Sequence, residues 1–224
     1  GSAEGGEYVR PAYQNARIHE GTRNAPYSAD IAAVRDEIVT IGKVEDQAEK
    51  TVDAEGLAVS PGFIDLHTHS DMSFLVDSLA DSKLRQGVTL ELVGNCGASF
   101  CAPLNDLTMG TFRSWARRAD SDLQPSWGDF AGYLDALEQA GSVINVATQI
   151  GHNQVRTFVM GEDARAPSTD ELIQMERIVA EALDAGAMGM STGLYFPPGY
   201  YSLTDEVIAL TKLVAARDKL YSSH

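Results

Sequence analysis

The chain has 224 residues, which is enough for one large domain or for one domain with a small companion. Lys and Arg total 17 against 32 Asp and Glu, and the resulting net charge of −15 argues against nucleic acids and anionic membrane surfaces as partners. No apolar run approaches the roughly 18 residues of a membrane span. We expect a cytoplasmic protein, although a chain that does not begin with methionine leaves room for a removed leader peptide.

The two cysteines, Cys96 and Cys101, are too few for a disulfide framework. They are close enough in sequence to pair with each other across a short loop. A reducing compartment, with one or both thiols free to bind a metal, is at least as consistent with their number and spacing.

Residues up to about 60 are predicted to form β-structure. Short runs with alternating or β-branched residues are separated by turn residues such as Gly21, Asp36 and Gly42, so we expect strands within 13–21, 28–42 and 50–62. His19 stands alone in this part and is expected to be an ordinary surface histidine of a strand.

From residue 62 onward, strands and helices are predicted to alternate. The expected strands are "GFIDLH" and the runs at 88–94, 143–151, 187–193 and from 220, and the expected helices lie at 78–86, 126–141, 168–186 and 204–219. We expect the second helix to begin at Ser126 and to end at Gly141. Ser168 and Glu171 form a capping box for the third. This alternation predicts right-handed parallel βαβ units.

The stretch "GFIDLHTHSD" places two of the five histidines one residue apart at the end of an apolar run. Residues i and i+2 of a strand face the same side, so His67 and His69 are expected to point together. A divalent metal is the simplest partner for two converging imidazoles. The alternative is an exposed or hydrogen-bonded pair at the end of a strand.

Polar groups also follow the later strands, at Asn95-Cys96, at Gly151 to Asn153, at Ser191 to Tyr195 and at His224. The C-terminal ends of parallel strands share one rim, where the active sites of such folds lie. Five separate segments that bring polar groups to one rim strengthen the prediction of a metal site well beyond the histidine pair alone.

These segments resemble the N-acyl-D-amino-acid deacylases (D-aminoacylases) of the amidohydrolase superfamily. The resemblance is carried by "SPGFIDLHTHSD", "LRQGVTLELVGNCGAS", "GHNQVRTFVMG", "STGLYFPPGYYSLTDEVIAL" and the terminal "YSSH", and it extends from about residue 12 to 224. The His-x-His element indicates only the superfamily. The cysteine of "GNCG" is more specific, because most relatives have a carboxylated lysine or a carboxylate there.

The resemblance implies an α/β fold, a (β/α)8 TIM-type barrel beside a small β-sandwich. Residues 1–60 would be part of the sandwich and 61–224 the first part of the barrel. A closed barrel needs eight strands and about 250 residues, and only five strands are predicted here. We therefore expect the chain to be the front portion of a longer protein.

The same resemblance implies a zinc site formed by His67, His69, Cys96 and His224, with nitrogen and sulfur ligands that suit this metal. A buried structural thiol is the alternative for Cys96, and the assignment of His224 depends on the family match. Cys101 matches no family motif and is expected to be a small apolar residue.

For the substrate, Tyr195 and Phe196 could line an apolar pocket on the proline-rich loop, or pack internally. His152 is expected at the rim, where it orients substrate or a loop, with an ordinary hydrogen-bonded histidine as the alternative. It is followed by Asn153, where relatives commonly have a glycine. Asp65 and Asp71 could orient the metal-binding imidazoles.

The implied reaction is zinc-dependent hydrolysis of the amide of a small molecule, an N-acyl-D-amino acid, giving a D-amino acid and a carboxylate. The catalytic aspartate that transfers the proton is expected beyond residue 224, so this chain alone is expected to be inactive. The alternatives are another amidohydrolase, acting on cyclic amides or on dipeptides with a D-residue, and a non-catalytic fragment.

Overall fold

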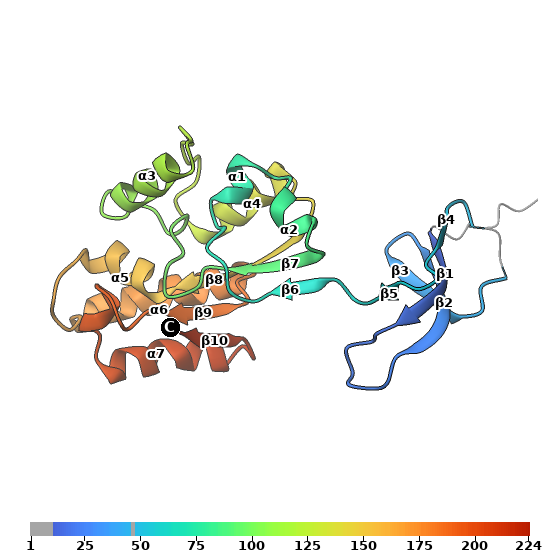
Figure 1. Cartoon of the computed structure of the whole chain (residues 1–224). Coiled ribbons are helices and arrows are strands. Elements are labelled where there is room, and N and C mark those ends of the chain that lie inside the picture. The colour runs from blue at the N-terminus through green and yellow to red at the C-terminus, as the bar shows by residue number, and fades with distance from the viewer. Residues whose placement is uncertain (1–10, 46–47) are drawn as a thin grey trace, which may run out of the picture. The chain divides into compact units, whose positions relative to one another are not determined.

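A computed structural model describes residues 11–45 and 48–224. The chain divides into two compact units, Gly1–Gly62 and Phe63–His224. In Figure 1 the described part of the first unit runs from blue to cyan, and the second unit runs from cyan to red. Parts of the small domain expected over residues 1–60, namely 1–10 and 46–47, lie outside the described residues.

The first unit is built on one five-stranded sheet. Its strands are β1 (Ala12–Ile18), β2 (Tyr27–Val34), β3 (Glu37–Gly42), β4 (Thr51–Asp53) and β5 (Ala58–Val59). The strand order is β3-β2-β1-β4, and β5 also pairs with β1. The β1–β2 and β2–β3 pairs are antiparallel, whereas β4 and β5 run parallel to β1. A small apolar cluster lies on this sheet and contains Ala16, Ile18, Ile31 and Ala54.

The second unit is built on a sheet of five parallel strands that forms a half-barrel. The strands are β6 (Phe63–Asp65), β7 (Val88–Val93), β8 (Asn145–Gly151), β9 (Gly189–Thr192) and β10 (Leu220–Ser223). They pair in chain order from β6 to β10, as Figure 1 shows. The predicted alternation into parallel βα units is thus confirmed, and the C-terminal ends of all five strands lie along one rim.

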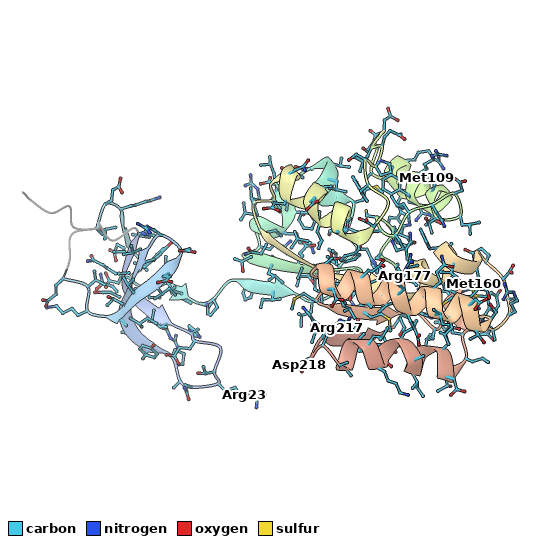
Figure 2. All side chains as sticks on the ribbon, turned by 180° about the vertical axis from the view of Figure 1, so that it is seen from behind. Arg23, Met109, Met160, Arg177, Arg217 and Asp218 are labelled. Atoms are coloured by element: carbon cyan, nitrogen blue, oxygen red, sulfur yellow. The ribbon has the colours of Figure 1, made fainter. Side chains whose placement is uncertain are left out.

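Helices connect these strands and supply most of the core. They are α1 (Ser73–Val76), α2 (Asp81–Leu84), α3 (Met109–Arg118), α4 (Phe130–Ala140), α5 (His152–Met160), α6 (Thr169–Ala185), the 3-10 helix η1 (Gly199–Tyr201) and α7 (Thr204–Ala215). The main core includes the fully buried Phe112, Tyr133 and Leu210. Arg217, which is labelled in Figure 2, lies just after α7. It forms a bidentate ion pair with Asp184 of α6, at 2.7 and 2.9 Å.

The cap residues of two helices test the predictions directly. Helix α6 begins at Ser168 with both hydrogen bonds of the predicted capping box to Glu171. Helix α4 ends at Gly141 in the left-handed conformation, as predicted, but it does not begin at Ser126. Its cap is Asp129, whose carboxylate accepts from the backbone N–H of Gly132 at 2.8 Å.

Other helices differ from the predictions. The helix expected at 78–86 is replaced by the two short helices α1 and α2, which are separated by an extended Asp77 and by Ala80 in the left-handed conformation. Helices α3 and α5 were not predicted. Helix α3 carries Met109, Phe112, Trp115 and Ala116 on one face at helical spacing, so its signal was present in the sequence and was overlooked. Helix α5 buries polar as well as apolar side chains and therefore shows no clear apolar stripe.

None of the helices in residues 11–45 and 48–224 combines enough length with enough apolar content to span a bilayer. Cys96 and Cys101 are both free thiols, so the disulfide considered from the sequence is not formed. Cys101 is buried in the main core, in the apolar role expected for it.

Candidate metal centre

Side chains with metal-ligand chemistry meet at the C-terminal rim of the half-barrel. The Nε2 atom of His67 lies 3.2 Å from Sγ of Cys96, and Nδ1 of His224 lies 3.1 Å from the same sulfur. One ligand atom each from His67, His69 and Cys96 falls within 4.8 Å of the others. The three segments follow β6, β7 and β10, so the sheet itself brings them together.

The two histidines converge without belonging to a strand. Strand β6 ends at Asp65, so the expected alternation does not place His67 and His69. Instead their rings approach edge-on, with centroids 5.6 Å apart and an angle of 77° between the planes. The backbone N–H of His67 is held by the carboxylate of Asp65 at 3.2 Å, and that carboxylate is paired with Lys83 at 2.6 Å.

Cys96 lies in a tight turn between Gly94 and Gly97, where there is no room for larger side chains. It adopts a left-handed conformation, with φ of 57°, between Gly94 and Gly97, whose φ angles are both 75°. A Cβ on Gly94 would lie 2.1 Å from the carbonyl oxygen of Gln149, so the turn is pressed directly against β8. The hydroxyl of Ser191 ties the turn together, because it accepts from the N–H of Gly97 at 2.9 Å and donates to the carbonyl of Gly94.

The surroundings of this cluster act in opposite directions on its imidazole and thiol groups. Burial lowers the pKa of His69, and the neighbouring His67 and His224 lower it further. Neutral imidazoles are the ligand-competent form. Burial raises the pKa of the Cys96 thiol, so this sulfur stays protonated unless a cation is beside it.

The donor set and spacing fit zinc. Zinc–sulfur and zinc–nitrogen bonds of about 2.3 and 2.0 Å put two tetrahedral ligands about 3.5 Å apart. The sulfur–nitrogen distances of 3.1 and 3.2 Å lie within a few tenths of an ångström of that value. A mixed imidazole and thiolate set is also the ligand chemistry that zinc prefers.

The two predicted pocket residues lie beside His224. The rings of Phe196 and His224 are 5.6 Å apart, and those of Tyr195 and His224 are 6.4 Å apart. Tyr195 is 81% exposed, whereas Phe196 is half-buried. His224 is itself aligned by its backbone N–H, which donates to the carbonyl of Thr192 at 2.9 Å.

His152 lies in the interior as the first residue of α5, with no exposed surface. Its Nε2 atom is 2.9 Å from Oε1 of Glu206 in α7, and Nη1 of the fully buried Arg156 is 2.6 Å from Oε2 of the same carboxylate. This buried network joins the N-terminal ends of α5 and α7. These ends flank the loop at 193–203 that carries the two pocket residues.

The two aspartates considered as partners of the imidazoles have other surroundings. Asp65 binds a backbone N–H and a lysine, as described above. Asp71 is buried, and burial raises its pKa to about 7 against the opposing effect of the backbone N–H groups of Asp71 and Gly94. The hydroxyl of Tyr133 donates to the Asp71 carbonyl at 2.9 Å, which fixes the backbone just after the histidine pair.

Comparison with known proteins settles the family. Residues 50–220 match the model of the amidohydrolase family. The chain belongs to this family. Among curated relatives, this amidohydrolase is 35% identical over 214 residues to a D-aminoacylase of Alcaligenes xylosoxydans xylosoxydans, covering 92% of the chain and 42% of the relative. It is 40% identical over 198 residues to an N-acyl-D-glutamate deacylase of the same organism, covering 88% and 39%.

Solved structures agree with this assignment. An N-acyl-D-glutamate deacylase from Bordetella bronchiseptica, complexed with zinc and a phosphonate mimic of the tetrahedral intermediate, matches with a TM-score of 0.86 at 33% identity. The match covers 97% of this chain and 45% of that one. A D-aminoacylase studied for its binuclear metal centre matches with a TM-score of 0.83 at 30% identity, covering 96% and 45%. The amidohydrolase chain thus spans less than half the length of these relatives.

Sequence analysis of this amidohydrolase missed the buried polar residues that support the rim. Glu206 occupies the first turn of α7, where an acidic residue normally faces solvent. Gln149 lies in a strand and Arg156 in an unpredicted helix. Arg156 and Glu206 fall within two of the segments that resemble the deacylases, but the segments do not indicate a role for either residue, and only tertiary structure gives each of the three its partner.

Proposed function

We propose that this chain belongs to a zinc-dependent deacylase that hydrolyses the amide bond of N-acyl-D-amino acids. The observation that carries the proposal is the convergence of two histidines, a cysteine and a further histidine on one rim of the half-barrel. Relatives at 35 and 40% identity with deacylase activities support the substrate class.

In this proposal His67, His69, Cys96 and His224 hold zinc. A metal bound there supplies a Lewis acid and lowers the pKa of a coordinated water toward ~7. The chain's own residues prepare the site for it. The lowered pKa of His69 favours its neutral, ligand-competent imidazole, and the thiol of Cys96 would give up its proton on binding the cation.

The substrate would lie against the loop at 193–203. Tyr195 and Phe196 stand beside His224 and are suited to form an apolar wall for the side chain or the acyl group. We assign His152 an indirect part, because its buried bond to Glu206 can hold this loop in place without contact with substrate. An apolar wall held in place beside a metal gives a reason for stereoselectivity. When the substrate carbonyl is at the metal, the side chain and the hydrogen on Cα occupy exchanged positions in the two enantiomers, so only one enantiomer places its side chain against the wall.

The proposal extends to the whole protein. The half-barrel would be the first part, 61–224, of a (β/α)8 barrel, and residues 1–60 would be part of a β-sandwich. The aspartate that transfers the proton would come from a later strand. Residues 1–224 alone would then bind zinc without useful turnover, because proton-transfer groups contribute ~10²–10⁴-fold.

Zinc binding is therefore the primary test. Cys96→Ala should remove zinc from the purified chain, measured by elemental analysis after dialysis, whereas Cys101→Ala should keep it. Cys101 is an equally small thiol buried in the core, so it controls for the loss of any cysteine. Unchanged zinc in Cys96→Ala would remove the proposed site.

The substrate class is tested on the whole protein by release of free amine from matched N-acetyl-D- and N-acetyl-L-amino acids. Methionine, leucine and glutamate derivatives cover apolar and acidic side chains. Faster release from the D-series is expected. Faster release from the L-series would refute the stereochemistry, and zinc binding without release from either series would point to cyclic amides or dipeptides. Absence of zinc and of turnover would favour a non-catalytic role.

A further inference from the structure

A chain of buried and partly buried hydrogen bonds crosses the rim at the candidate metal centre. The side-chain amide of Asn95 donates to the carbonyl of Thr68 at 3.3 Å. Its oxygen accepts from Nε2 of Gln149 at 3.2 Å, and Oε1 of Gln149 accepts from the hydroxyl of Ser222 at 3.0 Å. We call Asn95, Gln149 and Ser222 the amide relay.

Each end of the amide relay is next to a proposed ligand. Thr68 lies between the two histidines of the His-x-His element, and Asn95 directly precedes Cys96. Ser222 is two residues before His224. The relay therefore links all three ligand segments through side chains that leave the metal ligands themselves free.

The direction of the relay is fixed at one end. The Nδ2 of Asn95 donates to two backbone carbonyls, of Thr68 and of Leu92, the latter at 2.7 Å. A flipped amide would turn its oxygen toward both carbonyls, so Oδ1 must face β8. Gln149 must then donate with its nitrogen and accept with its oxygen. Only a side chain with both a donor and an acceptor satisfies this position.

Because Asn95 and Gln149 are buried, losing one of their hydrogen bonds is energetically costly. Gln149 has no exposed surface and Asn95 is 3% exposed, so neither can replace a lost partner with bulk water. Gln149 also lies on β8, between β7, which precedes Cys96, and β9, which pairs with β10. It is the one member of the relay that reaches both sides of the site.

We propose that Gln149 is a positioning residue of the metal centre, which acts through Asn95 and Ser222 to set the spacing of the ligand segments. The inference rests on the proposed function for the identity of the ligands. Partners that orient metal ligands in this indirect way typically contribute on the order of 10–100-fold to metal affinity.

The test compares two buried glutamines. Gln149→Leu removes the relay at nearly constant volume, and Gln154→Leu removes a similarly buried amide that donates to the Pro103 carbonyl at 2.9 Å. Zinc affinity is measured on the full chain by competition with a chromophoric chelator, and the cobalt-substituted protein reports the thiolate charge-transfer band. We expect a drop in zinc affinity on the order of 10–100-fold and a changed band only in Gln149→Leu.

A second pair of variants keeps the test decisive if Gln149→Leu does not fold. Ser222→Ala removes the hydroxyl at the half-buried end of the relay, and Ser222→Thr restores it. Weaker zinc binding in the first and recovery in the second are expected. Equal zinc affinity in all these variants and the wild type would overturn the relay while leaving the deacylase proposal intact. Absence of zinc binding by the wild type would refute the metal site and the relay together.

Discussion

Replacing Glu206 with Gln should destabilise the second unit more than any change of a surface ion pair. Arg156 is fully buried, and its Nη1 is 2.6 Å from the Glu206 carboxylate. Removal of one partner leaves the guanidinium charge buried and uncompensated, which costs about 3–5 kcal/mol. With a urea m-value of about 2–3 kcal/mol/M, the unfolding midpoint should fall by about 1–2.5 M.

Tryptophan fluorescence during urea unfolding is a suitable assay, because Trp115 and Trp127 both lie in the second unit. The matched control is Glu171→Gln, which removes an exposed ion pair with Arg165 at 2.7 and 2.8 Å. A glutamine at this position still completes the capping box. We expect a far smaller change there. Similar losses in Glu206→Gln and the control would refute the argument from burial.

The effect of Glu206→Gln should also depend on pH. Burial raises the pKa of Glu206, but its hydrogen bonds to His152 and Arg156 lower it more, so the net pKa lies below the usual value. The contribution of this carboxylate is therefore complete above the unfolded-state value of about 4.3 and is lost as the pH falls through the folded-state pKa. The stability difference between wild type and variant should persist at pH 5 to 8 and shrink below about pH 4.

Three further outcomes are expected. In the whole protein, Asn153→Ala should raise the KM of the proposed deacylase with little change in kcat, because the Asn153 amide exchanges bonds of 3.0 and 3.1 Å with the backbone of Gly193 at the start of the pocket loop. An unchanged KM would contradict this. Ser168→Ala should cost about 1 kcal/mol of unfolding free energy, through the lost cap of α6, in the urea assay. Zinc at 100 times its Kd should raise the unfolding free energy of the wild type by about 2.7 kcal/mol, and no rise would argue against binding to the folded state.

Local patterns in the sequence were sufficient for the regular part of the fold. The capping box at Ser168 and the closing Gly141 are both present because their partners lie within one helical turn. Strand β8 ends at Gly151 as predicted, since a short run containing β-branched residues and bounded by glycine needs no distant information. Helix α5 was not predicted, because polar residues on its buried face interrupt the apolar pattern of a helix. His152 and Arg156 are buried there by their bonds to Glu206 of α7, which is about 50 residues away in the sequence.

The candidate site also contains residues that the sequence predicts and residues that it does not. The His-x-His element and the glycine-flanked Cys96 are visible in the sequence as motifs, and the rim rule predicts that segments after parallel strands converge. The sequence gives no sign that Gln149 faces Asn95 or that Glu206 faces His152. Those pairs depend on which sides of β8 and α7 turn inward, and a buried polar residue has no local pattern that distinguishes it from an exposed one.

Strands β6 to β10 pair in chain order, so each can dock on a neighbour that is already in place, and the half-barrel can grow from one end to the other without a connection that skips a strand. The proposed metal ligands do not share this locality. Cys96 and His224 are 128 residues apart, at opposite ends of that growth. A site that includes both residues can therefore be completed only after every intervening strand has been added in register.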